Sequence, residues 1–258
     1  MRRIALIADV HANLRALDAV FADPAGEGIT ESYCLGDLVG YGPDPAMVIA
    51  RIRERGIPTV RGNYDDGIGN HRGDCGCYYD SEEARTNGRA SYDFTDAALS
   101  DADHAWLAAL PDSLRLDERG ARLLLTHGSP RRLNEYLLPD RPDHQLERLA
   151  REAEADVVCV GHIHMPYHRV VAPGIHYVSV PSVGKPKDGD PRAGWTELLL
   201  GEEAEVAEAG DPNASRAGET DVWVAAIVHR VPYDVEGAAA AVLAAGLPPH
   251  FAEALRRG

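Results

Sequence analysis

The sequence predicts an α/β fold in which two packed β-sheets are flanked by helices, and two patterns support this prediction. Apolar runs typical of strands alternate with helical patterns through the first two-thirds of the 258 residues, as in layered α/β domains. From about residue 169 the pattern changes to short strands and turns, which suits a second, mostly antiparallel sheet packed against the first. No internal repeat or linker separates the two parts, so we expect one domain over residues 1–258.

The first part is expected to begin with a strand at Ile4–Asp9 that leads into a helix. Leu14, Leu17 and Phe21 recur at intervals of three and four residues, which gives one apolar helical stripe, and Asn13 is placed to cap its start. Further strands are expected at Glu31–Asp37, Ile57–Val60, Leu114–Asp117, Arg122–Thr126 and Val157–Val160. Further helices are expected at Pro45–Glu54, Ser81–Ala90, Asp101–Leu110 and Asp143–Ala153.

Residues 64–110 are expected to form a loop-rich cap. Within it, Tyr64–Tyr79 is polar and rich in glycine, which predicts a loop over the functional site, and Ser100 with Asp103 forms a capping box for the second helix of the cap. The last third is expected to supply strands at His168–Val171, His176–Val180, Trp195–Leu200, Ala204–Glu208 and Val222–Val231, with Glu208–Asp221 as a hairpin tip or mobile loop. Asp234 and Pro248-Pro249 predict two C-terminal helices within residues 235–258.

Five short polar clusters each follow a strand-like apolar run. They are Asp9-Val10-His11, Gly36-Asp37, Gly62-Asn63-Tyr64-Asp65, His127-Gly128 and Gly161-His162-Ile163-His164. Because residues just past the carboxyl ends of neighbouring strands gather at one edge of a sheet, we expect these side chains to meet there. Apart from Asp65, the clusters offer two Asp, four His and one Asn, and these oxygen and nitrogen groups are ligands for metal ions.

Seven ligands exceed what one tetrahedral or octahedral ion takes from a protein, whereas two ions that share a carboxylate use all seven. Such ions lie about 3.5–4 Å apart and clamp the attacking and leaving oxygens of a displacement. Two divalent ions, two carboxylates and a bridging hydroxide leave about +1 of charge to face an anionic phosphoester. The sequence therefore predicts hydrolysis of a phosphoester by a hydroxide that bridges two divalent ions. Ligands without cysteine favour Mn²⁺, with Fe, Zn, Ni or Mg as alternatives.

The composition restricts location and partners. No apolar run approaches the ~20 residues needed to cross a membrane, and Asp9 and His11 interrupt the first apolar stretch too early for a secretory signal. We therefore expect a cytoplasmic protein with no membrane partner. The 41 acidic residues exceed the 26 basic ones, for a formal net charge of −15, which argues against capture of long nucleic acids. The sequence specifies no oligomeric state.

Four cysteines in a chain of this length do not form a disulfide framework. Cys34 and Cys159 lie within apolar strand runs and are expected to be small buried side chains. Cys75 and Cys77 form a Cys-x-Cys pair in the polar cap segment. We expect a structural role for this pair rather than a soft-metal site or a redox switch, because no second cysteine pair or nearby Cys–His spacing accompanies it.

The ordered clusters resemble those of the calcineurin-like metallophosphoesterases, whose pattern is Asp-x-His, Gly-Asp, Gly-Asn-His-Asp/Glu, His and Gly-His-x-His. The resemblance extends from Ile4 to His164, and Gly36–Pro45 and Ser182–Arg192 are similar to the bacterial branch related to diadenosine tetraphosphatases and type 2A protein phosphatases. It implies a four-layer αββα sandwich with two mixed sheets. It also implies one ion bound by Asp9, His11, Asp37 and His164, and another bound by Asp37, Asn63, His127 and His162.

One position departs from the family pattern. Tyr64 stands where many members have a histidine that is assigned to protonate the leaving group. A phenol with a pKa of ~10 is a poorer proton donor at neutral pH, so the site either favours leaving groups that need little protonation or borrows a donor such as His71. The candidate catalytic residues are Asp37, Asn63, Tyr64 and His127.

Candidate substrate-binding residues follow the metal-binding clusters in the chain. His71, Arg72 and Arg131 are expected to contact phosphate oxygens, and further candidates are Arg132, Lys185 and Lys187. Asp65 is expected to support Asn63 through hydrogen bonds rather than to bind metal. The substrate is expected to be a small or nucleotide-like phosphomonoester or phosphodiester. The alternative is a non-catalytic interaction scaffold, as in a retromer subunit related to the family, but such a protein should lose ligands that this sequence keeps.

Overall fold

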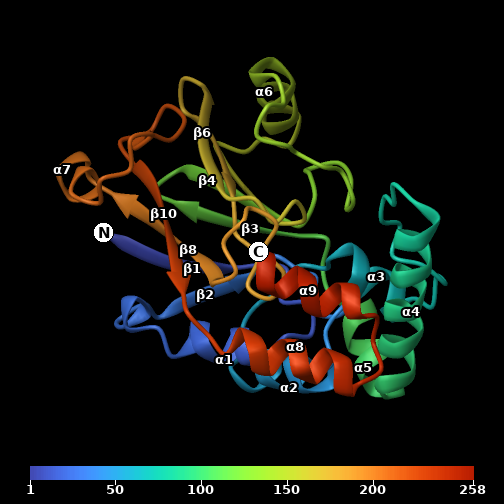
Figure 1. The fold of residues 1–258 in the computed structure, drawn as a ribbon. Coiled ribbons are helices and arrows are strands. Elements are labelled where there is room, and N and C mark those ends of the chain that lie inside the picture. The colour runs from blue at the N-terminus through green and yellow to red at the C-terminus, as the bar shows by residue number, and fades with distance from the viewer.

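The computed structural model covers residues 1–258 and has two five-stranded sheets between layers of helices (Figure 1). The strands are β1 (Arg2–Ile7), β2 (Glu31–Cys34), β3 (Ser113–Glu118), β4 (Ala121–Thr126), β5 (Val157–Val160), β6 (Tyr167–Ala172), β7 (Ile175–Ser179), β8 (Ala193–Gly201), β9 (Ser215–Arg216) and β10 (Trp223–Val231). The helices are α1 (Leu14–Phe21), α2 (Pro45–Glu54), α3 (Asn63–Gly69), α4 (Glu82–Ala98), α5 (Asp101–Ala108), α6 (Asp143–Glu152), α7 (Glu203–Ala207), α8 (Val235–Ala244) and α9 (Pro249–Arg257), with a 3₁₀ turn, η1, at Pro24–Gly26.

Both sheets are mixed, as the predicted fold class requires. The first sheet has the order β2-β1-β8-β10-β9 and the second the order β3-β4-β5-β7-β6. In the first, β1 pairs parallel with β2 and antiparallel with β8; in the second, β5 pairs parallel with β4 and β7. Because β1 and β2 are parallel, the segments that follow them leave the first sheet at the same edge. The segments that follow β4 and β5 likewise leave the second sheet at one edge.

The inner faces of the two sheets form one apolar core. Leu6 and Leu198 of the first sheet pack in the same buried cluster as Leu125 and Val157 of the second. Burial of each such side chain contributes about 1.5–3 kcal/mol. The outer faces are covered by helices, with α1 and α2 on the first sheet and α6 on the second, and Figure 1 shows α6 and α2 on opposite sides of the sheets. The four layers of the predicted sandwich are therefore present.

The last third of the chain does not form a sheet of its own, so that prediction was wrong. β8 and β10 join β1 in the first sheet, and β6 and β7 join β5 in the second. All nine residues of β8 are buried, so this strand needs cover on both faces, which a central position beside β1 provides. The polar segment before β10 contributes the short strand β9, which pairs with β10.

Two further assignments were wrong for local reasons. Residues 63–69 form α3 instead of a loop, because the Asp65 carboxylate accepts the Gly62 N–H at 2.9 Å and caps the helix. The expected strand Ala204–Glu208 is the helix α7, which is capped in the same way by Glu205 at the N–H of Glu202 (3.2 Å).

Other element boundaries differ from the prediction by smaller amounts. The expected strand Ile57–Val60 is reduced to an isolated bridge between Thr59 and Cys34, since Pro58 has no N–H to donate to a ladder. Helix α4 continues to Ala98 rather than ending at Ala90, because no glycine or proline interrupts residues 91–98.

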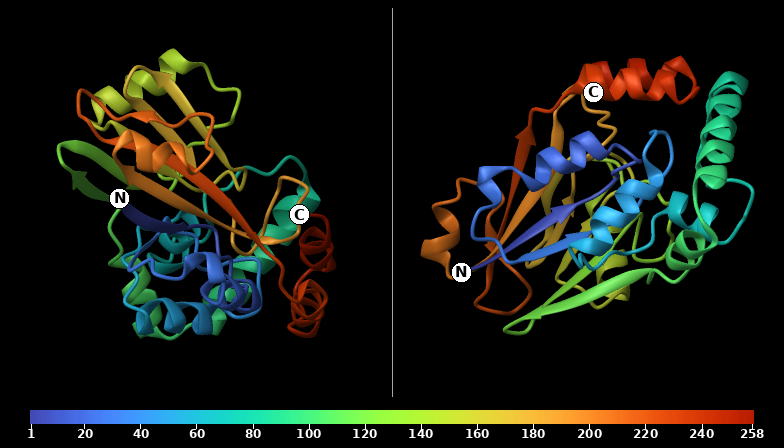
Figure 2. Two further views of the ribbon diagram at one scale, coloured as in Figure 1. Left: turned by 90° about the vertical axis from the view of Figure 1, so that its left-hand side faces the viewer. Right: turned by 90° about the horizontal axis from the view of Figure 1, so that it is seen from below.

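The C-terminal helices form a pair. Phe251 and Leu255 of α9 pack with Val242 of α8 in a separate buried cluster, and the two helices run at the periphery of the molecule in both views of Figure 2. Tyr41 is partly buried and packs against this cluster, which brings α8 and α9 next to the loop that follows β2. No helix of the chain combines the length and the apolar character that a membrane span requires.

Candidate metal centre

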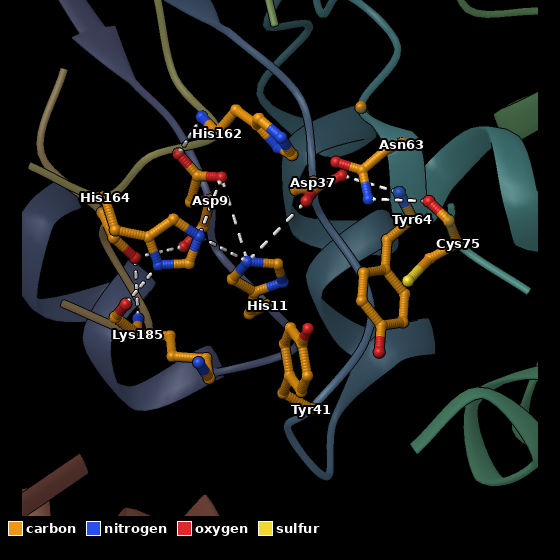
Figure 3. A network of polar contacts seen from close by, with 12 residues as sticks. Asp9, His11, Asp37, Tyr41, Asn63, Tyr64, Cys75, His162, His164 and Lys185 are labelled. Carbon is orange, nitrogen blue, oxygen red and sulfur yellow. Dashed lines mark hydrogen bonds and ion pairs between the residues drawn. The ribbon is translucent and has the colours of Figure 1, made fainter. Parts of the chain in front are cut away.

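The polar clusters that follow β1, β2, β4 and β5 converge, together with the start of α3. The structure brings the side chains together as two buried groups, in each of which the ligand atoms lie within 4.8 Å of one another. The Asp9 group consists of Asp9, His11 and His164, and the Asp37 group consists of Asp37, His127 and His162. The clusters come from both sheets, so the prediction that they share the edge of one sheet was too narrow. Figure 3 shows the three residues of the Asp9 group together with Asp37 and His162.

The carboxylate of Asp37 lies between a histidine of its own group and a histidine of the Asp9 group. Its Oδ2 is 3.8 Å from Nε2 of His11 and 3.4 Å from Nε2 of His127. Its Oδ1 accepts the backbone N–H of Tyr64 at 2.8 Å, which fixes the carboxylate with Oδ2 turned toward both histidines. This is the position that a carboxylate shared by two ions needs.

The backbone sets the orientation of three histidines. Nδ1 of His11 lies 3.0 Å from the carbonyl oxygen of Val39, Nδ1 of His127 lies 2.7 Å from that of Leu35, and Nδ1 of His164 contacts that of Lys185. A carbonyl only accepts, so each Nδ1 donates its hydrogen. Each Nε2 of a neutral imidazole is then a free lone pair directed into the centre, as is usual for histidines that bind metal.

Within the centre, groups that accept hydrogen bonds face one another. Nε2 of His11 lies 3.2 Å from Nε2 of His164, and Nε2 of His127 lies 3.0 Å from Oδ1 of Asn63. Oδ1 of Asp9 and Nε2 of His162 are buried without a hydrogen-bond partner. Buried lone pairs at such distances repel one another unless a positive charge lies between them. The donor set therefore fits divalent cations in both groups.

Protonated histidines do not supply that charge in the Asp9 group, and burial raises the pKa of Asp9 itself. Burial lowers the pKa of His11 to about 3, although Asp37 and Asp9 oppose this shift, and burial likewise holds the pKa of His164 well below its ordinary value. Burial also lowers the pKa of His162 to about 4. His127 differs, because the charge and hydrogen bond of Asp37 outweigh burial and raise its pKa to about 9.

The backbone is strained at the candidate ligands. Five of the six residues in the two groups have positive φ angles: 53° at Asp9, 47° at His11, 53° at Asp37, 67° at His162 and 61° at His164. Each such residue costs about 1–3 kcal/mol and persists only where the surroundings impose it, which happens most often at functional sites. The sharp turns after the strands are what point these side chains at one another.

Asp65 holds the loops of the centre together. Its carboxylate accepts the backbone N–H groups of Asp37 (2.8 Å), Leu38 (2.9 Å) and Gly62 (2.9 Å), and it does not belong to either ligand group. A Cβ on Gly62 would lie 2.1 Å from the backbone nitrogen of Asp37, so only glycine allows these loops to approach so closely. The expectation that Asp65 supports the Asn63 region through hydrogen bonds is confirmed.

The hydroxyl of Tyr64 is directed away from the centre. The side chain is fully buried, and its oxygen lies 3.2 Å from Oγ of Ser91 in α4, as Figure 3 shows by the orientation of the ring. A Cβ on Gly40 would lie 2.4 Å from this ring. Burial holds the pKa of Tyr64 well above its ordinary value. Tyr64 therefore contacts Asp37 through its backbone N–H and His11 through its ring, edge-on at 5.8 Å, while its hydroxyl is bonded to Ser91.

The predicted substrate-binding residues lie at different places. His71 is exposed, with Nδ1 3.5 Å from Oδ1 of Asp96 and its ring stacked on His104 at 4.5 Å. Arg72 forms an ion pair with Asp66 at 2.5 Å and lines a pocket of about 240 Å³ together with Asn63. The structure thus brings Arg72 near a ligand, whereas the contacts of His71 are with α4 and α5.

The remaining basic candidates also differ in position. Arg131 forms an ion pair with Glu135 at 2.6 Å. Nζ of Lys185 lies 4.5 Å from the centre of the Tyr41 ring, and burial lowers the pKa of Lys185 to about 7, with the charge of Lys187 as a second cause. Arg132 and Lys187 are exposed.

Two aromatic residues beside the histidines were not predicted. The ring of Tyr41 lies 4.9 Å from that of His11, and the ring of Tyr136 lies 4.3 Å from that of His162. Tyr41 lies within the segment Gly36–Pro45, but no role was assigned to it, and Tyr136 belongs to no recognisable cluster in the sequence. Tyr136 lies nine positions after His127, in a segment without a periodic pattern, so nothing in the sequence signals its place over His162.

The four cysteines divide into two kinds. Cys34 and Cys159 are free and buried in the core, as expected. Cys75 and Cys77 are joined by a disulfide, in the segment between α3 and α4. The amide nitrogen of Asn63 donates to the carbonyl oxygen of Cys75 at 3.0 Å and to Sγ of Cys77 at 3.2 Å, so the disulfide segment contacts a candidate ligand directly.

The chain is similar to known proteins over most of its length. Residues 2–200 match the model of the calcineurin-like phosphoesterase superfamily domain. An uncharacterised protein of Methanocaldococcus jannaschii is 30% identical over 209 residues, which cover 74% of this chain and 80% of that protein. The crystal structure of a metallophosphoesterase from Sphaerobacter thermophilus is 25% identical, with a TM-score of 0.71 and coverage of 99% and 98% of the two chains. A hypothetical protein of Pyrococcus horikoshii OT3 is 20% identical, with a TM-score of 0.75 and coverage of 100% and 99%, and it shares the fold.

Proposed function

Because the chain belongs to the calcineurin-like phosphoesterase superfamily, we propose that it is a metal-dependent hydrolase of small phosphomonoesters or phosphodiesters, nucleotide-like ones included. Membership of the superfamily supports phosphoesterase activity. The observation that carries the proposal is the pair of buried groups joined by Asp37, in which imidazole nitrogens, carboxylate oxygens and the amide oxygen of Asn63 face one another. An arrangement of this kind is costly to bury unless it binds cations.

The residues divide between two ions. One is assigned to Asp9, His11, Asp37 and His164, and the other to Asp37, Asn63, His127 and His162. When bound, two divalent ions supply hydroxide at neutral pH and offset charge on the phosphoryl oxygens. Imidazole, carboxylate and amide ligands without thiolate suit Mn²⁺ best, with Fe, Zn, Ni and Mg as alternatives.

The chain's own residues prepare the centre before substrate arrives. The carbonyl groups of Val39, Leu35 and Lys185 keep three imidazoles in the tautomer that exposes Nε2. Asp65 and the N–H of Tyr64 fix the position of the Asp37 carboxylate. Such preorganised groups stabilise developing charge without reorganisation during the reaction.

The position of Tyr64 bears on the choice of leaving group. The Tyr64 hydroxyl is hydrogen-bonded to Ser91, and His71 contacts Asp96 and His104. Neither of the two predicted proton donors is therefore directed at the centre. We therefore assign the enzyme a preference for leaving groups that depart with little protonation, such as aryl or phosphoryl oxygens. The net charge of −15 supports a small substrate over a long nucleic acid.

A test of the proposal uses protein reconstituted with Mn²⁺ and two aryl substrates, p-nitrophenyl phosphate and its bis ester. We expect metal-dependent turnover of at least one ester. In Asp37→Asn, which removes charge from the shared ligand, kcat/KM should fall on the order of 10³-fold, because one substitution weakens both ion sites. Protein that binds two ions yet hydrolyses neither ester nor any member of a nucleotide panel would instead support the non-catalytic scaffold.

A further inference from the structure

The segment between α3 and α4 contains a disulfide that the proposed reaction does not use. Cys75 and Cys77 are joined with their Cα atoms 5.3 Å apart. Gly76 between them has a φ of +63°, which glycine adopts without strain. The segment also lies close to α3, since a Cβ on Gly67 would be 2.5 Å from the carbonyl oxygen of Asp74. The disulfide is therefore part of the wall that supports the helix beginning with Asn63.

This segment determines which atom Asn63 presents to the metal centre. The two hydrogens of its amide are directed to the carbonyl oxygen of Cys75 (3.0 Å) and Sγ of Cys77 (3.2 Å). With both hydrogens used, Oδ1 faces Nε2 of His127 at 3.0 Å. If the amide turned over, it would lose both hydrogen bonds and would direct N–H groups at the ion site. The Cys75–Cys77 segment thus acts as a clamp on a metal ligand.

The disulfide borders a cavity, unlike the other two cysteines, with Cys75 6% exposed and Cys77 half-buried. Cys75 and Cys77 line a cavity of about 760 Å³ between their segment and α4. Cys34 and Cys159 are fully buried in apolar clusters, and burial raises the pKa of Cys159 to about 12. Thiol chemistry depends on access and on the thiolate form, so the chain has one place where it can occur.

We propose that the Cys75–Cys77 disulfide is a reversible redox site that controls binding of the ion beside His127 and Asn63. The proposal rests on the proposed function and adds a regulatory input to it. The oxidised form holds the Asn63 amide in the orientation that binds metal. Reduction opens the ring formed by residues 75–77, so the Cys75 carbonyl and the Cys77 sulfur no longer have fixed positions and the ligand is released.

The reductant is a small dithiol or a dithiol protein. A thiolate of the reductant attacks one sulfur of the disulfide, forms a mixed disulfide and displaces the other cysteine as a thiolate. The second thiol of the reductant then attacks the mixed disulfide and displaces the remaining cysteine. In total, two electrons and two protons pass to Cys75 and Cys77, and the reductant leaves as its own disulfide.

The experiment compares metal retention in the two states of the full chain. Protein loaded with Mn²⁺ is divided, and one half is reduced with a phosphine, which is then removed by anaerobic gel filtration. We expect two additional thiols per chain in the reduced half. We also expect one of the two ions to be lost to a chelator about 10- to 100-fold more readily than in the oxidised half, the range typical for groups that orient a metal ligand.

Matched variants separate the clamp from general effects of reduction. Cys75→Ser/Cys77→Ser should resemble the reduced wild type with or without phosphine, and Cys34→Ala/Cys159→Ala should keep the difference between the two states. If a double variant does not fold, as judged by circular dichroism, the comparison within the wild type decides alone.

Three outcomes would overturn the inference. Equal ion retention after the two thiols have appeared would show that the disulfide does not control the ligand. Failure of any thiol to appear would show that the disulfide is closed to reductants. Absence of bound ions from both halves would overturn the proposed function together with this inference, whereas the first two outcomes leave the proposed function intact.

Discussion

The two halves of the metal centre present the same kinds of ligand but are supported in different ways. In the Asp9 group, the loops that follow β1, β2, β5 and β7 supply the polar contacts, including the carbonyls that hold His11 and His164. The Asp37 group faces Asn63, whose orientation depends on the disulfide segment after α3. We infer that the first half is fixed by the sheets themselves, whereas the second can be adjusted without disturbing the core.

The electrostatics of the two halves differ as well. Burial lowers the pKa of His11 to about 3 and keeps that of His164 far below neutrality. The pKa of His127 is raised to about 9, since the adjacent Asp37 outweighs the effect of burial. Without metal, the Asp37 group thus compensates its negative charge with a proton on His127. The imidazoles of the Asp9 group carry none, and burial instead raises the pKa of the Asp9 carboxyl. An ion entering the Asp37 group must displace that proton, which predicts binding that weakens at lower pH.

Of the changes that test this difference between the halves, removal of one histidine from either half should have the largest effect on metal binding and activity. His164→Ala and His127→Ala each delete one Nε2 ligand, so each should reduce bound Mn²⁺ from two ions to one and lower kcat/KM on the order of 10²- to 10³-fold. Only His127→Ala should abolish the difference between oxidised and reduced protein. Elemental analysis and kinetics check this, with the exposed His250→Ala on α9 as control.

Retention of two ions by both variants would show that the histidines are not the main ligands. Loss of both ions from either variant would show that the halves are not independent, and the contrast between them would then disappear.

The sequence predicted the residues that meet in the two groups because each cluster directly follows a strand-like run, and this succession is a local pattern. It did not identify the sheet to which β8 and β10 belong, because pairing between β8 and β1 joins residues almost 200 positions apart. Alternation of apolar and polar residues predicts that a strand exists but does not predict which strand it pairs with. The neighbours of a strand depend on burial of both its faces, which only the assembled core defines.

The orientation of single side chains could not be predicted from the sequence either. Tyr64 occupies the position of a family histidine, yet its direction depends on space left by Gly40 and on Ser91, a residue of α4. Likewise, a structural role was expected for the pair Cys75 and Cys77. Their contact with Asn63 arises only because the segment that follows α3 turns back along this helix. Both cases depend on packing between elements that no local pattern encodes.

The contributions of His11 and His127 to the stability of the metal-free protein should depend on pH in opposite directions. The folded pKa of His11, about 3, lies below the unfolded value of ~6.5. The unfolded chain therefore binds more protons between these values, and stability falls as the pH decreases from ~6.5 toward 3. The folded pKa of His127, about 9, lies above the unfolded value, so its contribution is complete below ~6.5 and is lost as the pH rises toward 9.

Differences between variants isolate these contributions from those of other titrating groups. In thermal melts of chelator-treated protein, His11→Gln should reduce the loss of Tm between pH 7 and pH 5, and His127→Gln should reduce the loss between pH 7 and pH 9. Each kcal/mol corresponds to about 2–4 °C for a chain of this size. Identical pH profiles for wild type and both variants would contradict the difference in charge between the halves.

The smallest effect is expected for Tyr64→Phe, although the residue occupies a catalytic position of the family. The substitution removes a buried hydrogen bond to Ser91 (3.2 Å), worth about 1 kcal/mol, while Oγ of Ser91 still accepts the N–H of Tyr41 at 2.7 Å. Tm should fall by about 2–4 °C, and kcat/KM should stay within about threefold on aryl and alkyl phosphates alike, since the N–H that holds Asp37 remains. A tenfold loss confined to alkyl phosphates would place the phenol in proton transfer and would require α4 to move during the reaction.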